Sequence, residues 1–393
     1  MAGKKSISEI KSSVKFDMKS IAKKVGNKLG MQVGFHDPEV WLDTGNYLLN
    51  YCISNDFYRG IPLEGKVTMI AGESGSGKSL FGSGMAVKDA LDKGVLVNFI
   101  DTEDAATEEW IRKAGVDTEH PNYARIQKNS MSEILQYISD MCKNYNDAFE
   151  GVDESEQPGM LFVLDSFSAM YSEMEEKQYE SAEFQMTDGM RKAIDNAKFV
   201  NACLSKCASK KIGFIFVNHV STNMDMYAAP TISGGKKAIF LASIVIQMDK
   251  NKLSEFEVKG KSTASTSEDR EQVGIKTSFK VQKTRFTQPF QGGKIFVPYN
   301  GGVQRYSGLF DFFRDKKLIK DGEKANTYKY VSCITGDEIF CEMKKNITDE
   351  MWDKVMQDFM EGQKQSLFGN NKSEYKEPTI EETLDSIISA DAE

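Results

Sequence analysis

One run of eight residues constrains what this chain can fold into more than any other feature. The run reads Gly72-Glu73-Ser74-Gly75-Ser76-Gly77-Lys78-Ser79, and it matches the phosphate-binding pattern GxxxxGK followed by Ser or Thr. Its glycines let backbone amides turn toward phosphates, Lys78 suits the β- and γ-phosphates, and the Ser79 hydroxyl suits Mg²⁺. An apolar segment, 67–71, precedes the run, and a helical stretch, 79–92, follows it. This strand–loop–helix context predicts a site for ATP and Mg²⁺ that extends through Leu80.

Short apolar runs alternate with helical stretches after this loop. We predict strands at 67–71, 94–100, 160–164, 212–217 and 242–248. Helical stretches are expected between them, at 79–92, 131–149 and 188–209. Two more strands are expected within 275–298, and 251–272 is typical of a hairpin tip or an insert. Apolar strands separated by helices predict an α/β fold, in which helices cover both faces of a mostly parallel sheet.

Acidic residues follow two of the predicted strands. Asp165 comes after the apolar run at 160–164, where an acid can hold Mg²⁺ together with Ser79; an ordinary strand-end aspartate is the plainer alternative. Asp101 and Glu103 come after the strand at 94–100, where ATP hydrolysis needs a group that activates water. Alternation along a strand directs both side chains to the same side, so position does not distinguish them. A solvated acidic turn is the alternative for this segment.

The distribution of charge limits the possible functions. The net charge of −8 argues against a protein that coats nucleic acid through bulk electrostatics. The first thirty residues nevertheless contain eight lysines and the last twenty contain seven acids, which indicates interaction segments or simply solvated ends.

No apolar run reaches the roughly eighteen residues of a membrane span. The lysine-rich start has no apolar signal region and the six cysteines form no CxxC pair, so we expect a cytoplasmic protein.

Beyond the phosphate-binding loop, several segments resemble the RecA family, most closely the phage recombinases of the UvsX type. The likeness extends from residue 42 to about residue 330, and it includes 42–45, 60–65 and 306–311. The family places its catalytic glutamate in a strand-end pattern, FIDxE, which 99–103 matches. The resemblance therefore selects Glu103 as the residue that activates water.

The resemblance implies an ATP-dependent DNA recombinase. Such a protein hydrolyses ATP in the presence of DNA, forms a filament on single-stranded DNA, pairs that strand with a homologous duplex and exchanges strands during recombination and repair. A single-strand-binding protein and a loading mediator are the implied partners, and the host cytoplasm is the implied location if a phage encodes the chain. A hexameric helicase on the same core and a nucleotide-dependent scaffold that does not hydrolyse ATP are the alternatives.

Four more residues acquire roles from the resemblance. Trp110 corresponds to an aromatic residue that contacts adenine, although a core residue on a helix face fits the pattern nearly as well. His219 follows Asn218 at a strand end, where the family senses the γ-phosphate. Lys283 and Arg285 correspond to cations that reach the ATP site of a neighbouring subunit. Cations on the wet face of an alternating strand are the alternative for these two residues.

DNA contacts are also implied by the resemblance. The loop after His219, at 220–233, corresponds to the main DNA-contacting loop, and a second loop is expected within 175–187. The candidate DNA-binding residues are Arg191, Lys192, Met224, Met226, Tyr227, Gly234, Gly235, Lys236 and Lys237. Met224, Met226 and Tyr227 could enter between bases or pack on a neighbouring subunit.

We therefore expect four parts in the chain. A basic helical arm for subunit contact spans 1–40, and a RecA-like ATPase core with its DNA loops spans 41–305. A small C-terminal α/β domain spans 306–365, and an acidic tail spans 366–393.

Overall fold

The structure is a computed structural model, and it divides into two compact units, residues 1–304 and 305–393. It describes residues 17–29, 37–153, 155–176, 188–207, 211–221, 231–254, 272–300 and 302–369.

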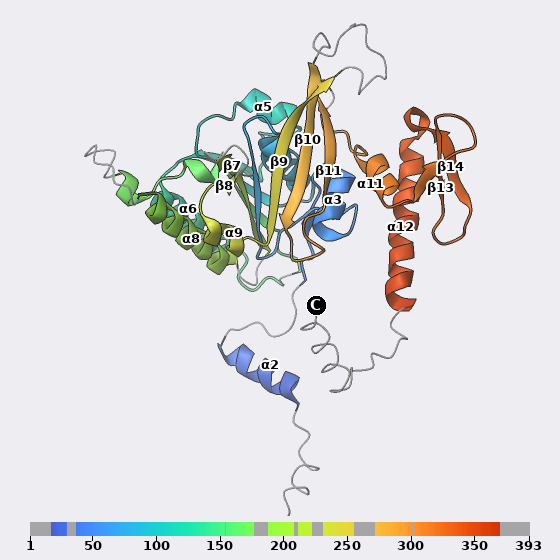
Figure 1. The fold of residues 1–393 in the computed structure, drawn as a ribbon. Coiled ribbons are helices and arrows are strands. Elements are labelled where there is room, and N and C mark those ends of the chain that lie inside the picture. Colours follow the sequence, from blue (N-terminus) through green and yellow to red (C-terminus); the bar gives the residue numbers. More distant parts are fainter. Residues whose placement is uncertain are drawn as a thin grey trace, which may run out of the picture. The chain divides into compact units, whose positions relative to one another are not determined.

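A nine-stranded sheet, counted over the described residues, forms the centre of the first unit (Figure 1). Its strands are β3 (Val67–Gly72), β4 (Leu96–Asp101), β5 (Tyr123–Gln127), β6 (Met160–Asp165), β7 (Ile212–Ser221), β8 (Thr231–Ile232), β9 (Ile244–Ser254), β10 (Gln272–Lys283) and β11 (Gly292–Pro298). The order is β11-β10-β9-β3-β7-β6-β4-β5, with β8 paired to β7. Pairing from β9 to β5 is parallel, whereas β10 and β11 are antiparallel. The predicted mostly parallel α/β sheet is confirmed.

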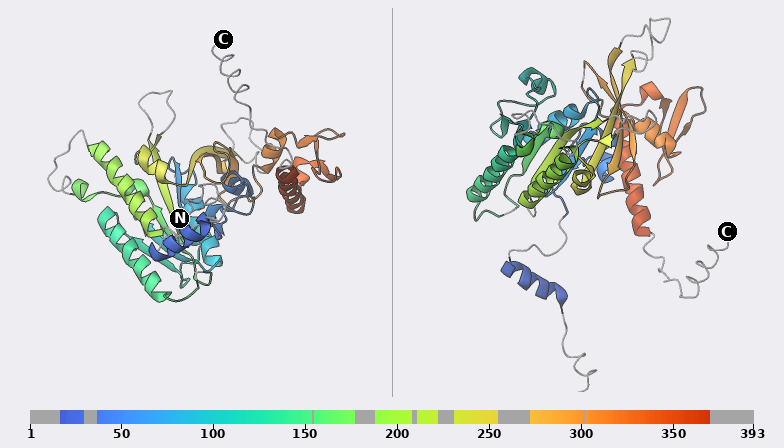
Figure 2. Two further views of the ribbon diagram at one scale, coloured as in Figure 1. Left: turned by 90° about the horizontal axis from the view of Figure 1, so that it is seen from below. Right: turned by 60° about the vertical axis from the view of Figure 1, so that its left-hand side comes forward.

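Helices cover both faces of this sheet, as the continuous apolar strands require. Phe162, Phe214 and Phe216 point to one face, where they pack with α6 (Met131–Ala148) and α8 (Asp188–Cys207). Figure 2 shows these two helices side by side on that face. On the other face a π-helical turn, η1 (Leu80–Met85), leads into α4 (Ala86–Asp92). A Cβ at Gly82 would lie 3.1–3.2 Å from Val217, Ile215 and Ile70, so this glycine permits close packing of η1 on the sheet.

Shorter elements complete the described part of the first unit. They are α2 (Met18–Leu29), β1 (Trp41–Leu42), α3 (Tyr47–Ser54), β2 (Ile61–Pro62), α5 (Glu108–Lys113), η2 (Phe167–Ala169) and α9 (Lys236–Leu241). The lysine-rich helix expected near the start of the chain corresponds to α2 in its described portion. The side chain of Asn46 accepts the Leu49 amide at 3.0 Å and thereby caps the start of α3.

The second unit has a three-stranded sheet and two α-helices in its described residues. The elements are α11 (Leu309–Asp315), β12 (Ile319–Asp321), β13 (Thr327–Val331), β14 (Glu338–Met343), η3 (Lys344–Asn346) and α12 (Asp349–Gly369). Phe313, Tyr330 and Phe340 lie in its core. Asp358 of α12 is buried beneath β13, where it accepts hydrogen bonds from the Tyr330 hydroxyl at 3.1 Å and the Cys333 amide at 2.8 Å.

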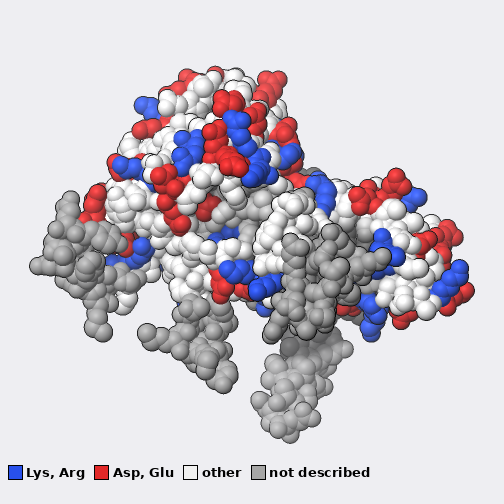
Figure 3. All heavy atoms as spheres, turned by 90° about the horizontal axis from the view of Figure 1, so that it is seen from above, with Lys and Arg blue, Asp and Glu red and all other residues white. Residues whose placement is uncertain are grey.

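Charged side chains are mixed on the molecular surface. On the described part of the face drawn in Figure 3, Lys and Arg side chains lie among Asp and Glu side chains. This mixture agrees with the modest net charge of −8. Among the described residues, no helix has the length and apolar character that crossing a membrane requires.

Candidate nucleotide site

The phosphate-binding loop joins β3 to η1, so it lies at the carboxyl end of the sheet's central strand. Gly75 and Gly77 have φ values of +74° and +97°, a region in which glycine has no steric penalty. A Cβ at Gly72 would lie 2.2 Å from the Met248 carbonyl oxygen of the adjacent β9, so no larger residue fits there. The Thr277 hydroxyl of β10 donates to the Ser76 carbonyl at 2.9 Å and fixes the loop from the antiparallel side of the sheet.

Lys78 is buried at the base of this loop, with 6% of its surface exposed. Its Nζ donates to the Glu73 carbonyl at 2.8 Å. Burial lowers the pKa of the Lys78 ammonium group, and the nearby carboxylates of Asp165 and Glu103 oppose that shift. An anionic phosphate would compensate the buried charge, which makes this lysine suited to phosphate binding.

Asp165 ends β6 beside the loop and faces two hydroxyl groups. Ser83 Oγ donates to Asp165 Oδ2 at 2.8 Å, and Ser79 also forms a side-chain hydrogen bond to Asp165. Burial raises the pKa of Asp165, and these hydrogen bonds act in the opposite direction. A hydroxyl and a carboxylate oxygen beside a phosphate-binding loop are the ligands that Mg²⁺ prefers, so Ser79 and Asp165 fit that ion.

Asp101 and Glu103, the two candidates for the residue that activates water, have different surroundings in the structure. Strand β4 ends at Asp101, so strand alternation does not extend to Glu103 and does not fix the direction of its side chain. Asp101 is buried, and its Oδ2 lies 2.7 Å from Nη2 of Arg125. The Glu103 side chain is 38% exposed and lines the pocket. Both acids line the pocket, but Asp101 is paired with Arg125, so Glu103 remains the predicted residue that activates water.

His219 comes from β7 and meets Glu103. Its Nε2 lies 3.2 Å from Glu103 Oε1, and the Ser166 hydroxyl donates to the same oxygen. The preceding residue, Asn218, is buried and donates through Nδ2 to the Ser233 carbonyl at 2.7 Å. The end of β7 thus contacts both the acid in the pocket and Ser233, the last residue of the predicted DNA loop at 220–233.

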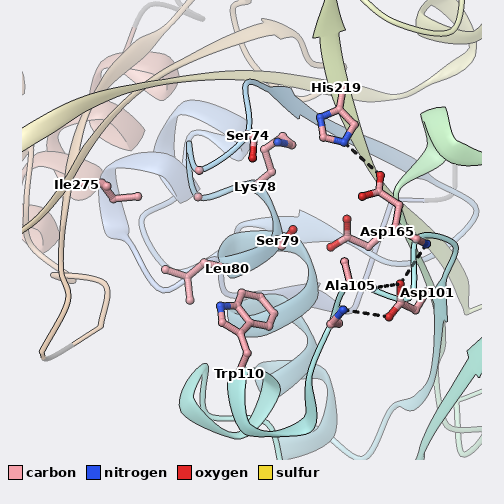
Figure 4. Close-up of a pocket in the computed structure, with 14 residues that line it drawn as sticks. Ser74, Lys78, Ser79, Leu80, Asp101, Ala105, Trp110, Asp165, His219 and Ile275 are labelled. Atoms are coloured by element: carbon pink, nitrogen blue, oxygen red, sulfur yellow. Dashed lines mark hydrogen bonds and ion pairs between the residues drawn. The ribbon is translucent and has the colours of Figure 1, made fainter.

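Most of the predicted nucleotide-binding residues line a single pocket of about 420 Å³. Figure 4 shows Lys78, Ser79 and Asp165 in its middle, with His219 at one end and Trp110 at the other. Trp110 is 37% exposed, which disfavours the alternative of a core residue. The residues that line the pocket are Ser74, Gly75, Gly77, Lys78, Ser79, Leu80, Asp101, Glu103, Ala105, Ala106, Trp110, Asp165, His219 and Ile275.

The predicted main DNA loop is anchored on described residues at both ends. Strand β8 pairs antiparallel with the end of β7, and the Ser233 amide donates to the His219 carbonyl at 3.0 Å. Gly234 and Gly235 have φ values of +100° and +89°, and a Cβ at Gly235 would lie 2.6 Å from the Ala193 Cβ of α8. Lys236 and Lys237 are exposed in the first turn of α9. Met224, Met226 and Tyr227 lie outside the described residues.

The other DNA candidates have partners within the chain. Arg191 Nη1 donates to the Met174 sulfur at 3.4 Å, and Lys192 forms an ion pair with Glu175 at 3.1 Å. Most of the second predicted loop, 177–187, lies outside the described residues.

Lys283 is the last residue of β10 and Arg285 follows the strand, and neither lines the pocket of their own chain. Lys283 donates to the Phe240 carbonyl, and burial, followed by the charge of Arg285, lowers the pKa of Lys283. Arg285 is exposed. Their role at a neighbouring subunit's site stays a prediction.

Sequence reasoning missed several residues that shape the pocket. Ser83 and Thr277 hold Asp165 and the phosphate-binding loop through the hydrogen bonds described above. Arg125 belongs to β5, whose sequence, YARIQ, is too polar to have been recognised as a strand. The periodicity of 79–92 predicts that one helix face packs on the sheet, which is the only signal that could have indicated Ser83.

Comparisons with known proteins indicate the family of the chain. The family model described as "RecA N-terminal domain" matches residues 12–304. The chain is 26% identical over 324 residues to Protein RecA of Tropheryma whipplei (strain Twist), covering 80% of this chain and 65% of that protein. It is 24% identical over 346 residues to Protein RecA of Corynebacterium glutamicum (strain R), covering 85% of this chain and 82% of that protein.

Among solved structures, the chain is similar to "Crystal structure of the RadB recombinase", with 17% identity and a TM-score of 0.44. That alignment covers 68% of this chain and 100% of the other. The assignment rests on the family model, which matches more than half of the chain and includes the phosphate-binding loop, Glu103, Asp165 and His219. The chain belongs to the RecA family.

Proposed function

We propose that this protein is an ATP-dependent DNA recombinase that forms a filament on single-stranded DNA, pairs it with a homologous duplex and exchanges strands. The observation that supports this proposal most strongly is the contact between Glu103 in the nucleotide pocket and His219 at the end of β7. That strand ends at Ser221, within the segment predicted to be the main DNA loop, 220–233. One contact thus links an ATP site to a segment that could bind DNA.

The chemistry proposed for the pocket is hydrolysis of ATP to ADP and phosphate. Backbone amides of the loop and Lys78 bind the phosphates, while Trp110 contacts the base. Mg²⁺, held by Ser79 and Asp165, would neutralise charge on the phosphate oxygens. Glu103 takes a proton from the attacking water; the water oxygen forms a bond to the γ-phosphorus, and the bond to the β–γ bridging oxygen breaks.

His219 couples this step to the DNA loop in our proposal. When a γ-phosphate occupies the pocket, the Glu103 carboxylate reorients toward water and its contact with His219 changes. Because Asn218 and the His219 carbonyl both contact Ser233, a shift at the end of β7 reaches the base of the loop. Loop residues Met224, Met226 and Tyr227, with Gly234, Gly235, Lys236 and Lys237, then contact DNA, and Arg191 and Lys192 form a second contact region.

Assembly completes the site in this proposal. Arg285 and Lys283 of one subunit reach the γ-phosphate of the next, where a cation can raise the rate by about 10³–10⁵. Such a head-to-tail contact is heterologous and generates a helical filament. The basic arm at 1–40 contributes to the subunit contact, and the acidic tail at 366–393 competes with DNA for basic surface.

Partners and subgroup are proposed on the same basis. The His219 variant of the strand-end pair favours the phage UvsX type within the family. We expect a single-strand-binding protein and a loading mediator to act with this protein, in the cytoplasm of the cell that contains it.

ATP turnover with and without single-stranded DNA tests the proposal. We expect turnover to rise on addition of single-stranded DNA and electron micrographs with ATP to show open helical filaments. Closed rings would favour the helicase alternative instead. Tight ATP binding with no turnover under either condition would favour a scaffold.

A further inference from the structure

Asp101 is a buried acid that the proposed hydrolysis does not use. Its side chain is only 2% exposed, and it lies directly before the loop that contains Glu103. The carboxylate accepts the backbone amides of Glu103 at 3.2 Å, Ala105 at 3.4 Å and Ala106 at 3.2 Å. Glu103, Ala105 and Ala106 all line the pocket, so the Asp101 carboxylate holds the backbone of a segment that borders the nucleotide site.

Arg125 supplies the cation for this buried carboxylate. It comes from β5, the strand that pairs with β4 at the edge of the sheet. Its Nη2 lies 2.7 Å from Asp101 Oδ2 and 2.9 Å from Asp104 Oδ1. Asp104 has a φ of +53°, an unfavourable conformation for a residue other than glycine, and the contact with Arg125 helps to hold it. One guanidinium group therefore anchors both ends of the segment that contains Glu103.

The hydrogen bond to Asp101 is the largest of the influences that raise the pKa of Arg125, as expected for a cation paired with a carboxylate. Asp101 is the buried partner, so removing Arg125 leaves a buried charge unpaired, which is more unfavourable than losing a pair whose two side chains are both exposed. Without Arg125, the Asp101 carboxylate would turn toward solvent and release the three amides. The loop at 102–106 would then lose its conformation.

We propose that Arg125 is a positioning residue, which holds the loop at 102–106 and through it places Glu103 and the pocket wall for ATP hydrolysis. The catalytic half of this inference rests on the proposed function. The conformational half does not, because it concerns only the order of the loop.

Arg112 offers a matched comparison in the same unit. It belongs to α5 and forms an ion pair with Glu108 at 2.7 Å, but the two side chains are 52% and 61% exposed. An exposed pair of this kind contributes little to stability. Arg112→Met and Arg125→Met therefore remove the same type of side chain and ion pair and differ in whether the carboxylate is buried.

The experiment measures amide hydrogen exchange at 102–106, ADP affinity and ATP turnover in the full-length protein. For Arg125→Met we expect exchange at 102–106 to be at least about tenfold faster and kcat at least about tenfold lower. Arg112→Met should match the parent protein in all three measurements. Arg125→Lys keeps a charge but replaces the planar guanidinium group with an ammonium group on a differently shaped side chain, so its values should be intermediate.

A rescue variant distinguishes positioning from general damage. In Asp101→Asn combined with Arg125→Met, the neutral side chain no longer needs a cation and still accepts two of the amides. We expect its exchange at 102–106 to return to within about threefold of the parent protein. Unchanged exchange in Arg125→Met, or an absence of rescue, would overturn the proposal. If Arg125→Met does not fold, Arg125→Lys and the rescue variant give the same decision.

Failure of the proposed function would look different. A parent protein without ATP turnover would contradict hydrolysis, yet faster exchange in Arg125→Met and its rescue would still support the positioning of the loop. If the parent protein hydrolyses ATP and the kcat of Arg125→Met is unaffected, the proposed function stands. Only the claim that Arg125 positions Glu103 is then contradicted.

Discussion

The Glu103 carboxylate and the His219 imidazole lie 3.2 Å apart although 116 positions separate the two residues in the sequence. Glu103 follows strand β4, and His219 lies near the end of strand β7. Strand β6 lies between these two strands in the sheet. The contact therefore crosses the carboxyl end of β6, where Asp165 and Ser166 lie. Three parallel strands place their terminal polar residues at one edge of the sheet, which is where α/β folds place their ligand sites.

Glu103→Gln should retain binding of ATP and Mg²⁺ while turnover falls by about 10²–10⁴-fold, because glutamine can hydrogen-bond water but cannot accept its proton. Steady-state hydrolysis and nucleotide affinity check this. Glu109→Gln, at an exposed position of α5, is the control and should behave like the parent protein. The choice of acid is wrong if Asp101→Asn, with an intact loop, abolishes turnover while Glu103→Gln does not.

His219→Ala should remove the stimulation of ATP turnover by single-stranded DNA, because the link between Glu103 and the loop after β7 is lost. Turnover without DNA should fall less than in Glu103→Gln, since the water-activating carboxylate remains. The ratio of the two rates, with and without DNA, is the measurement. His120→Gln, in a turn outside the pocket, serves as the control. A stimulation ratio unchanged in His219→Ala would exclude the proposed coupling.

Lys78→Met should abolish phosphate binding yet stabilise the protein without nucleotide at pH 7. Burial lowers the pKa of Lys78 in the folded state, so the unfolded chain holds more protons there. The free energy of unfolding then rises with pH between the folded pKa and the ordinary lysine value of about 10.4. We expect a Tm about 2–4 °C above that of the parent protein at pH 7, if the effect is near 1 kcal/mol, and a smaller difference as pH rises toward 10.

Thermal unfolding of Lys78→Met and of the parent protein, measured from pH 7 to pH 10, gives the Tm difference between them at each pH. Lys88→Met removes an exposed lysine that pairs with Asp92, and its Tm difference from the parent protein should not change in this way. A Tm for Lys78→Met that lies below that of the parent at pH 7, or a difference that is constant with pH, would contradict the prediction.

Arg285→Ala and Glu103→Gln should each have low activity alone and recover activity when mixed. If Arg285 acts on the neighbouring subunit, some interfaces in a mixed filament combine an intact pocket with an intact arginine. ATP turnover as a function of the mixing ratio is the measurement. Lys280→Ala changes an exposed lysine of β10, the strand before Arg285, and this variant should be active on its own. Mixtures that never exceed the sum of their components would mean that Arg285 does not act in trans.

The strands of the central sheet could be predicted because both of their faces are buried. Residues such as Phe214 and Ile215 pack on opposite helical layers, so β7 is a continuous apolar run that sequence reasoning recognises. Strand β5 lies at the sheet edge, and its two exposed central residues, Ala124 and Arg125, interrupt the apolar signal. Because β5 was not predicted, Arg125 could not be recognised as the partner of Asp101.

The site was predictable where a local pattern encodes it. The phosphate-binding loop needs glycines at fixed positions, and the φ values of Gly75 and Gly77 show why. The distinction between Asp101 and Glu103 depends instead on where β4 ends and on an arginine from another strand. Such contacts between distant segments leave no periodic signal in the sequence.

Strand exchange is the measurement that tests the central proposal most directly. The protein is mixed with ATP, Mg²⁺, single-stranded DNA and a homologous duplex with one fluorescently labelled strand. We expect joint molecules followed by release of the labelled strand, and no release with a heterologous single strand or with Lys78→Met. Release that is independent of homology, or filaments on DNA that never release the labelled strand, would contradict the account.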